Sequence, residues 1–181
     1  MFEAHEAQIL AYAMRRTIQL ADAEDAAAEV FTIAWRRVSD IPDDALPWLY
    51  GVARRVLANQ RRGGLRRLNL VRHVEDDVPT PDHLGTDQDS PGIIALARLQ
   101  PGDQELLRLV AWEDLDHAEI ATVLGITSNA VAIRLHRARQ RFAAMLGEVE
   151  SERGLKGLAL SRTFRWRRAT HDAAPEGVGD D

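Results

Sequence analysis

The chain has 181 residues, of which 45% are hydrophobic and 28% are charged, and it contains no cysteine. This length allows one domain or two small ones, and the lack of cysteine excludes disulfides and thiolate metal sites. Its longest apolar runs are far shorter than the roughly 20 residues that span a bilayer, and no apolar segment follows the N-terminus. We therefore expect a soluble, cytoplasmic protein without membrane insertion.

Apolar spacing in the first third of the chain predicts three helices, over about 3–19, 22–38 and 47–62. The third should begin near Pro47 and end at Gly63-Gly64. The inward face of the second helix is expected to contain Val30, Phe31, Ala34, Trp35 and Val38.

An acidic, proline-rich segment follows these helices. Residues 75–92 contain six acids, three of the seven prolines and no basic residue, which is typical of an extended linker. We therefore expect an all-α protein of two small helical domains, over residues 1–72 and 93–147, joined by an acidic linker over residues 73–92. The tail, residues 148–181, is expected to be disordered, with an added nucleic-acid contact or an autoinhibitory segment as the alternatives.

The clearest local pattern lies in the second domain. A helix from Asp103 is followed by Asp116, which forms a capping-box sequence with Glu119, and by a turn at Gly125. Thr127 or Ser128 should then cap a long helix that ends near residue 146. Its expected buried stripe is Val131, Leu135, Ala138, Phe142 and Met145. Two helices joined by a short turn, the second with a basic outer face, are typical of a helix-turn-helix.

Basic residues are segregated along the chain although its net charge is −5. Residues 45–74 contain seven arginines and residues 125–147 contain four, and neither block contains an acid. This pattern favours binding of a phosphate backbone at two places over the alternative of solvated helix faces. Base contacts in the major groove are expected from Asn129, Ala132, Ile133, His136 and Arg137. Phosphate contacts are expected from Thr127, Ser128, Arg134, Arg139 and Arg141.

No enzyme motif is present in the sequence. It contains no glycine-rich phosphate loop, no HExxH or GxSxG motif and no EF-hand spacing, and its six histidines are scattered. We therefore expect no catalytic residue, no metal and no cofactor.

Three stretches of the sequence, taken together, form a further pattern. Residues 22–37 read DAEDAAAEVFTIAWRR, residues 46–62 read LPWLYGVARRVLANQRR, and residues 113–139 read EDLDHAEIATVLGITSNAVAIRLHRAR. In this order, with the acidic linker before the third, they resemble regions 2.2, 2.3–2.4 and 4.2 of the extracytoplasmic-function (ECF, group 4) RNA polymerase sigma factors of bacteria. This resemblance to the sigma-70 family covers about residues 2–147.

The resemblance implies a bacterial transcription initiation factor that is a monomer when free. Such a protein binds core RNA polymerase through the β and β′ subunits, recognises −35 and −10 promoter elements and promotes DNA melting. An anti-sigma factor is a further implied partner. The first domain would be sigma region 2, with polymerase and −10 contacts, and the second would be sigma region 4, which reads the −35 element.

The implied site residues fall on two predicted helices. Polymerase contacts are implied for Asp25, Glu29, Phe31 and Trp35, although the sequence favours a core position for Phe31 and Trp35. Contacts with the unpaired −10 strand are implied for Trp48, Arg54, Arg55, Asn59, Arg61 and Arg62. Trp48 fits base stacking and a core position equally well.

Several positions depart from the family pattern: Ala28, Arg55, Asn129, Ala130 and Ala132. Because Ala132 stands where the family frequently has a lysine or arginine, we expect weaker recognition of the −35 element or a preference for A·T pairs there. Two alternatives to a sigma factor remain. One is a helix-turn-helix regulator that binds duplex DNA without polymerase, and the other is a sigma-like decoy that docks on polymerase or an anti-sigma factor but cannot open DNA.

Overall fold

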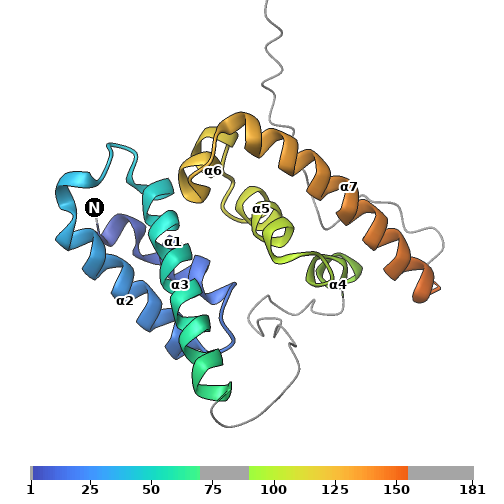
Figure 1. Cartoon of the computed structure of the whole chain (residues 1–181), viewed down its shortest axis with the longest axis horizontal. Coiled ribbons are helices and arrows are strands. Elements are labelled where there is room, and N and C mark those ends of the chain that lie inside the picture. The colour runs from blue at the N-terminus through green and yellow to red at the C-terminus, as the bar shows by residue number, and fades with distance from the viewer. Residues whose placement is uncertain (1, 70–89, 155–181) are drawn as a thin grey trace, which may run out of the picture.

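The computed structural model describes residues 2–69 and 90–154, and it gives the backbone alone for residues 2, 3 and 64–69. The first half contains α1 (Phe2–Met14), α2 (Leu20–Arg36), the short 3-10 helix η1 (Val38–Asp40) and α3 (Ala45–Asn69). The second half contains α4 (Pro91–Ala97), α5 (Pro101–Ala111), α6 (His117–Leu124) and α7 (Ser128–Glu152). Figure 1 shows α1–α3 as one group and α4–α7 as the other, with α3 and α6 at their border. The prediction of an all-α fold is confirmed.

Helix α3 is longer than the sequence predicts. It places Pro47 in its first turn, as expected, but it continues through Gly63 to Asn69. The prediction that the glycine pair ends the helix is wrong. A glycine inside a helix costs about 1 kcal/mol relative to alanine, which weakens a helix but does not require it to stop. The predicted inward face of α3 is confirmed, since Leu49, Val52, Ala53, Val56 and Leu57 are all buried.

The buried face of α2 differs from the predicted one. Its side chains that lie in the core are Ala23, Ala26, Ala27, Val30 and Ala34. Trp35 is 72% exposed and Val38 is 63% exposed, so the prediction that both face inward is wrong. The stripe is centred on alanines, whose small side chains let α2 approach α1 and α3 closely. Trp35 lies one position, or about 100° of helix rotation, away from it.

The helix-turn-helix is formed by α6 and α7, whose axes meet at 98°. Asp116 caps α6 with its Oδ1, which accepts from the backbone N–H groups of Ala118 at 2.7 Å and Glu119 at 2.8 Å. Gly125 ends α6 with a φ of 67°, a conformation that glycine adopts without steric cost. Thr127 Oγ1 accepts from the Ala130 N–H at 3.2 Å and caps α7. The predicted capping box, turn and cap are confirmed.

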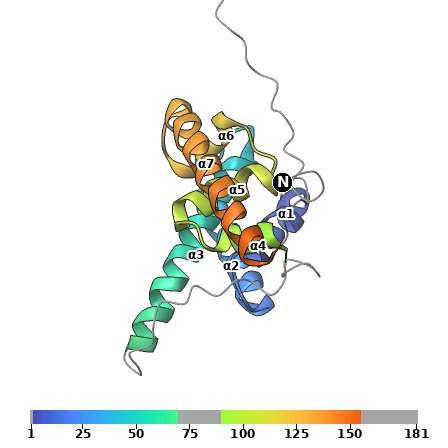
Figure 2. The same cartoon turned by 90° about the vertical axis from the view of Figure 1, so that its right-hand side faces the viewer.

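Helices α4, α5 and α7 enclose a second core cluster. Figure 2 shows these three helices grouped together. The predicted stripe of α7 is buried except for Met145, which is partly buried. The sequence did not predict α4. The expectation of a disordered tail from residue 148 is corrected for its first residues, because α7 runs to Glu152 and Val149 is 1% exposed. Residues 155–181, which hold most of the predicted tail, lie outside the described residues.

The two halves share one hydrophobic core cluster. It contains Ile9 and Tyr12 of α1 together with Leu109 of α5 and Ile120 and Val123 of α6. Helices α3 and α6 pack directly on each other. The halves are therefore joined by a packed interface as well as by the segment between them.

Among the described residues, no single helix has the length and apolar character needed to cross a membrane. The bent pair of α6 and α7 meets these criteria by length and composition, a test that buried core helices also pass.

Candidate nucleic-acid interface

The predicted base-reading residues lie together on the outer face of α7. Asn129, Ile133, His136 and Arg137 are exposed, and Ala132 is half-buried beside them. The His136 ring nitrogen Nε2 is 3.1 Å from Gln140 Nε2 on the next turn. Ile133 is 47% exposed, which makes it an apolar contact point on an otherwise polar face. Such a face can offer hydrogen bonds and one methyl-sized contact to base edges.

The predicted phosphate-binding residues flank this face. Ser128, Arg134, Arg139 and Arg141 are exposed. Partial burial lowers the pKa of Arg139, although an arginine stays charged at neutral pH. Arg141 donates from Nη1 to Asp103 Oδ2 of α5 at 2.7 Å, so this arginine is already paired inside its own domain.

The predicted −10 residues share one exposed side of α3. Arg54, Arg55, Asn59, Arg61 and Arg62 are all exposed and recur at helical spacing. Arg62 Nη2 donates to Asn59 Oδ1 at 2.6 Å, and Arg55 Nε donates to the Gly51 carbonyl at 3.0 Å. Trp48 is half-buried against the core, which supports its core alternative while part of its side chain stays accessible.

The predicted polymerase-binding residues lie along α2. Asp25 and Glu29 are exposed and stand one turn apart. Phe31 is partly buried and packs on the core cluster, as the sequence favoured. Trp35 is 72% exposed, so its expected core position is wrong.

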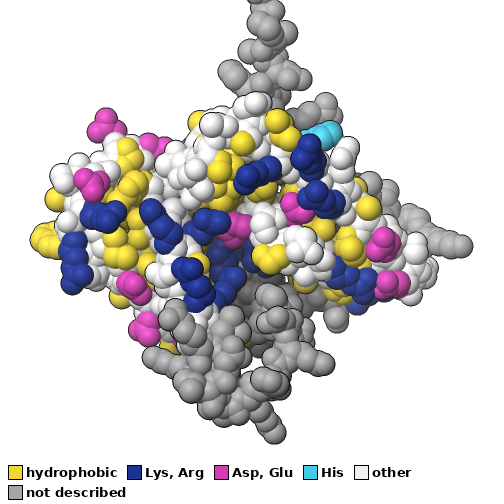
Figure 3. All heavy atoms as spheres, viewed as in Figure 1, with side chains coloured by type: hydrophobic (Ala, Val, Ile, Leu, Met, Phe, Trp, Pro, Cys, Tyr) yellow, Lys and Arg dark blue, Asp and Glu magenta, His cyan; other side chains and the backbone are white. Residues whose placement is uncertain are grey.

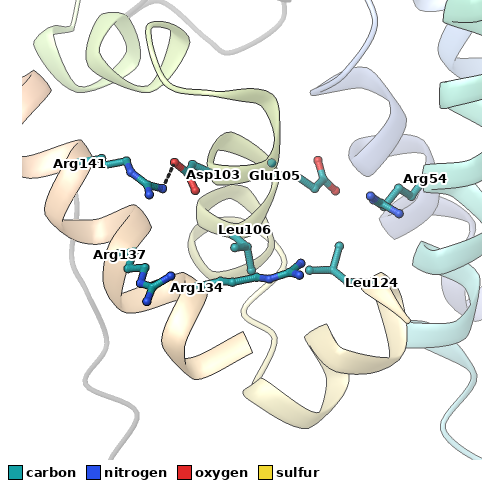
Figure 4. Close-up of a pocket in the computed structure, with 9 residues that line it drawn as sticks. Arg54, Asp103, Glu105, Leu106, Leu124, Arg134, Arg137 and Arg141 are labelled. Carbon is teal, nitrogen blue, oxygen red and sulfur yellow. Dashed lines mark hydrogen bonds and ion pairs between the residues drawn. The ribbon is translucent and has the colours of Figure 1, made fainter. Parts of the chain in front are cut away.

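A cavity of about 330 Å³ lies between the halves and brings together arginines predicted to act at different promoter elements. Figure 4 shows Arg54 entering it from α3, and Arg134 and Arg137 lying along it on α7. Much of the remaining cavity wall is formed by Asp103, Glu105, Leu106 and Leu124. In the space-filling view, basic side chains gather on both sides of the border between the halves (Figure 3).

A second charged site, which the sequence did not predict, is buried between α1 and the second half. We call it the interdomain charge cluster, and it consists of Tyr12, Arg15, Arg16, Glu105 and Glu113. Arg16 Nε donates to Glu105 Oε2 at 3.0 Å, and its Nη1 donates to Glu113 Oε1 at 2.8 Å. The Tyr12 hydroxyl donates to Glu105 Oε1 at 2.7 Å, and the Arg16 guanidinium stacks 3.5 Å from the centre of the Tyr12 ring. The side chains of Arg16 and Glu113 are 2% and 0% exposed.

Burial and charge act against each other in this cluster. Burial raises the pKa of Tyr12; the charge of Arg16 acts to lower it, and Glu105 and Glu113 act to raise it. Burial acts to raise the pKa of Glu105, but the charge and hydrogen bonds of Arg16 and the hydrogen bond from Tyr12 hold it below its usual value. Burial acts to lower the pKa of Arg16, but Glu105 and its other partners raise it. Burial also raises the pKa of Tyr50, whose ring lies 5.0 Å from that of Tyr12, to about 12. The pair of Arg16 and Glu105 is therefore fully ionised at neutral pH.

One sequence signal could have located this cluster. Ile9, Tyr12 and Arg16 are spaced by three and four residues, so Arg16 continues the buried stripe of α1. A charged residue on a buried stripe requires a partner of opposite charge.

Within residues 2–69 and 90–154, no three side chains of the types that bind metals come close enough together to hold an ion.

Two sequence families match the chain in the order of its halves. The family of Sigma-70 region 2 matches residues 1–67, and the family of Sigma-70, region 4 matches residues 95–142. The ECF RNA polymerase sigma factor SigL of Mycobacterium tuberculosis is 32% identical over 157 residues, which cover 82% of this chain and 88% of that protein. The RNA polymerase sigma factor NccH of Alcaligenes xylosoxydans xylosoxydans is 31% identical over 141 residues, which cover 69% and 73%.

Solved structures share the fold. The sigma factor RpoE of Bartonella quintana, in complex with the anti-sigma factor NepR, superposes with a TM-score of 0.61 at 19% identity, over 81% of this chain and 94% of that one. CnrH, in complex with the cytosolic domain of CnrY, superposes with a TM-score of 0.56 at 22% identity, over 81% and 85%.

Proposed function

The chain belongs to the ECF RNA polymerase sigma factors, and from this membership we propose how its helices share the work of promoter recognition. The protein is an RNA polymerase-associated factor that recognises promoters. The observation that carries this function is that region 2 and region 4 sequences occur in order and both halves adopt their helical folds. We propose that residues 1–72 and 93–147 are the two working domains and that residues 73–92 connect them.

Helix α2 is the proposed docking surface for core polymerase. Asp25 and Glu29 offer exposed carboxylates on its solvent side, and Trp35 offers an exposed aromatic ring. Tryptophan is enriched among the residues that dominate binding energy at protein interfaces, because its large ring buries much apolar surface. Phe31 supports this surface from the core side.

Helix α3 and the loop before it are the proposed site for the unpaired −10 strand. Arg54, Arg55, Arg61 and Arg62 supply positive charge along one side of the helix, and Asn59 supplies an amide among them. Arginines in this arrangement neutralise a single-stranded phosphate backbone, and the accessible part of the Trp48 side chain is the proposed contact for an unpaired base.

Helix α7 is the proposed reader of the −35 element. Its outer face presents Asn129, His136 and Arg137 for hydrogen bonds with base edges, and the exposed Ile133 suits the methyl group of thymine. Because Ala132 carries no hydrogen-bonding group, we propose an A·T-directed −35 element. A promoter selection that returns a strong G-rich −35 consensus would contradict this preference.

The proposed partners follow from this role. They are core RNA polymerase and promoter DNA, both in the cytoplasm, with no cofactor and no catalytic step performed by the chain itself. An anti-sigma factor is proposed as a regulator, because a protein that shares the fold is solved in complex with one.

Run-off transcription tests the function directly. Purified protein is combined with core RNA polymerase and a library of upstream DNA from its own genome, and transcripts are mapped. We expect specific start sites that require both components, and their alignment supplies the −35 and −10 elements.

The same assay separates the alternatives. Polymerase that co-purifies with the protein but yields no transcript would favour a sigma-like decoy. Tight binding to duplex operators, with neither transcripts nor polymerase binding, would favour a regulator that acts without polymerase.

A further inference from the structure

We propose that the cavity between the halves is a binding site for a small phosphate-bearing anion, of which inorganic pyrophosphate is the simplest. The cavity has a volume of about 330 Å³, and its wall is formed by residues of α3, α5, α6 and α7 (Figure 4). Ligand pockets of ordinary size measure roughly 300–1,000 Å³, so this cavity fits a small molecule. The site goes beyond the proposed function, because it requires neither polymerase nor DNA.

Three arginines, which we call the cavity arginines, supply the positive charge of this site. Arg134 and Arg137 lie one turn apart on α7, and Arg54 reaches the cavity from α3 on the opposite side. Within residues 2–69 and 90–154, no carboxylate forms an ion pair with any of the three. Like charges around a cavity raise the local concentration of anions.

The two acids of the cavity wall are already bound to other arginines. Asp103 Oδ2 accepts from Arg141 Nη1 at 2.7 Å. Glu105 accepts from Arg16 twice, from Nε at 3.0 Å and from Nη2 at 3.2 Å. Both acids are therefore balanced without the cavity arginines, whose charge is left for a ligand.

The arrangement suits phosphate better than carboxylate. A guanidinium offers parallel N–H donors that match two oxygens of either group. A carboxylate has only two oxygens, which lie in one plane, whereas a phosphate group offers three strong acceptor oxygens that point in different directions. The cavity arginines approach from two helices on opposite sides, so each can bind different oxygens of one diphosphate.

Gly102 is a position at which the cavity can be filled without changing an arginine. It lies in the first turn of α5 and lines the cavity. Outside its own helix backbone and chain neighbours, no described atom lies within 4 Å of a Cβ added there. Gly102→Glu would add bulk and negative charge to the cavity wall, and a carboxylate in the first turn of a helix is favourable. We therefore expect this variant to fold and to repel an anion.

Isothermal titration calorimetry of the full chain with inorganic pyrophosphate, at fixed salt and without divalent cations, tests the site. Citrate is titrated in parallel as a multiply charged carboxylate. The variants that alter the cavity are Arg54→Ala, Arg134→Ala and Gly102→Glu. Their matched controls make the same changes at exposed positions that do not line the cavity, namely Arg55→Ala on α3, Arg139→Ala on α7 and Gly147→Glu on α7.

We expect the unchanged chain to bind pyrophosphate at one site and to bind citrate more weakly. Arg54→Ala and Arg134→Ala should each weaken pyrophosphate binding by about tenfold or more, because each removes charge-assisted hydrogen bonds to the anion. Gly102→Glu should weaken it as well, through repulsion and lost space. If an arginine variant loses helical circular dichroism, Gly102→Glu decides the question, since it keeps every arginine.

The control variants decide whether binding is local to the cavity. We expect them to bind pyrophosphate within about threefold of the unchanged chain, because salt screens exposed charges outside the cavity. Equal weakening in each variant and its control would assign the effect to the net charge of the chain and overturn the site. A lack of saturable binding, or citrate bound as tightly as pyrophosphate, would overturn it too. None of these outcomes bears on the proposed function, since polymerase and DNA are left out of the titration.

Discussion

Arginine serves opposite purposes in two regions of this molecule. Arg16 lies in the turn after α1, its side chain is 2% exposed, and it binds two carboxylates of the other half. The arginines of α3 up to Arg62 and those of α7 up to Arg141 lie on the surface, where the proposed ligand is nucleic acid. Both sets follow apolar residues on amphipathic helices, so composition does not distinguish them. They differ in the side of the helix on which they lie. An arginine in line with the buried side chains packs between the halves, whereas an arginine on the solvent-facing side can contact DNA.

Removing the buried arginine should give the largest effect on stability. In Arg16→Ala, Glu105 and Glu113 lose their main partner, and breaking a buried ion pair costs about 3–5 kcal/mol. The halves can relieve this cost by separating, so we expect a single urea transition to become two, one for each half. Urea unfolding followed by circular dichroism and by tryptophan fluorescence would measure this.

A double substitution sharpens the result. When Glu105→Ala is added to Arg16→Ala, the loss should be smaller than the sum of the two single losses, because the second change removes an unpaired acid. Additive losses, or one unchanged transition in Arg16→Ala, would show that the pair does not couple the halves.

Removing an exposed arginine should leave stability intact and weaken DNA binding. For Arg137→Ala we expect a loss of about 1–3 kcal/mol in binding a −35 element and relaxed preference at one base position, because one base contact is lost. The free energy of unfolding should change by less than about 0.5 kcal/mol. Holoenzyme binding to a set of single-base promoter variants at fixed salt measures the preference. If Arg137→Ala weakened binding equally on every promoter variant, Arg137 would be a phosphate contact and not a base contact.

Arg134 on the same helix provides the matched comparison. As a proposed phosphate contact, Arg134→Ala should weaken all promoter variants alike and reduce the slope of log K against log salt by about 1. Titrations at several salt concentrations would measure that slope. A change in base preference with an unchanged slope would exchange the proposed roles of Arg134 and Arg137.

The elements that the sequence predicted correctly are those with local signals. The capping box at Asp116, the turn at Gly125 and the stripe from Val131 to Phe142 lie within a few residues of the groups they contact. The exposed position of Trp35 was missed because the core face of α2 is made of alanines, whose weak hydrophobicity gives little periodic signal against a tryptophan next to it.

The charge cluster was missed for a different reason. Arg16 lies 89 positions before Glu105 and 97 before Glu113, with the acidic segment between them. Local periodicity places Arg16 on a buried stripe but does not identify a partner at that distance. The acidic segment also suggested two separate domains, and a close approach such as that of Gly51 to α6 leaves no trace in composition.

Acid should weaken the contact between the halves through Glu105. This carboxylate faces Tyr12 of α1, Arg16 just beyond α1 and Arg108 of its own helix, and its pKa is lowered because Arg16 and the hydrogen bonds outweigh burial. A pKa below the unfolded value of about 4.3 means that its stabilisation is present above that pH and is lost as pH falls through the lowered pKa. Urea midpoints measured between neutral pH and about pH 3 should therefore fall at the acidic end, and the fall should be smaller in Glu105→Gln. An equal fall in that variant would assign the effect to other carboxylates.

The smallest effect is expected for an arginine that is paired but exposed. Arg98, which caps the end of α4, binds Glu152 of α7 through two hydrogen bonds of 3.0 and 2.9 Å, a geometry as good as that of Arg16. Its side chain is 41% exposed and that of Glu152 is 57% exposed, so water and salt screen the pair and hydrate either partner when the other is removed. We expect Arg98→Ala to leave the urea midpoint within experimental error at physiological salt. A loss comparable to that of Arg16→Ala would show that hydrogen-bond geometry, and not burial between the halves, determines what an arginine pair contributes in this protein.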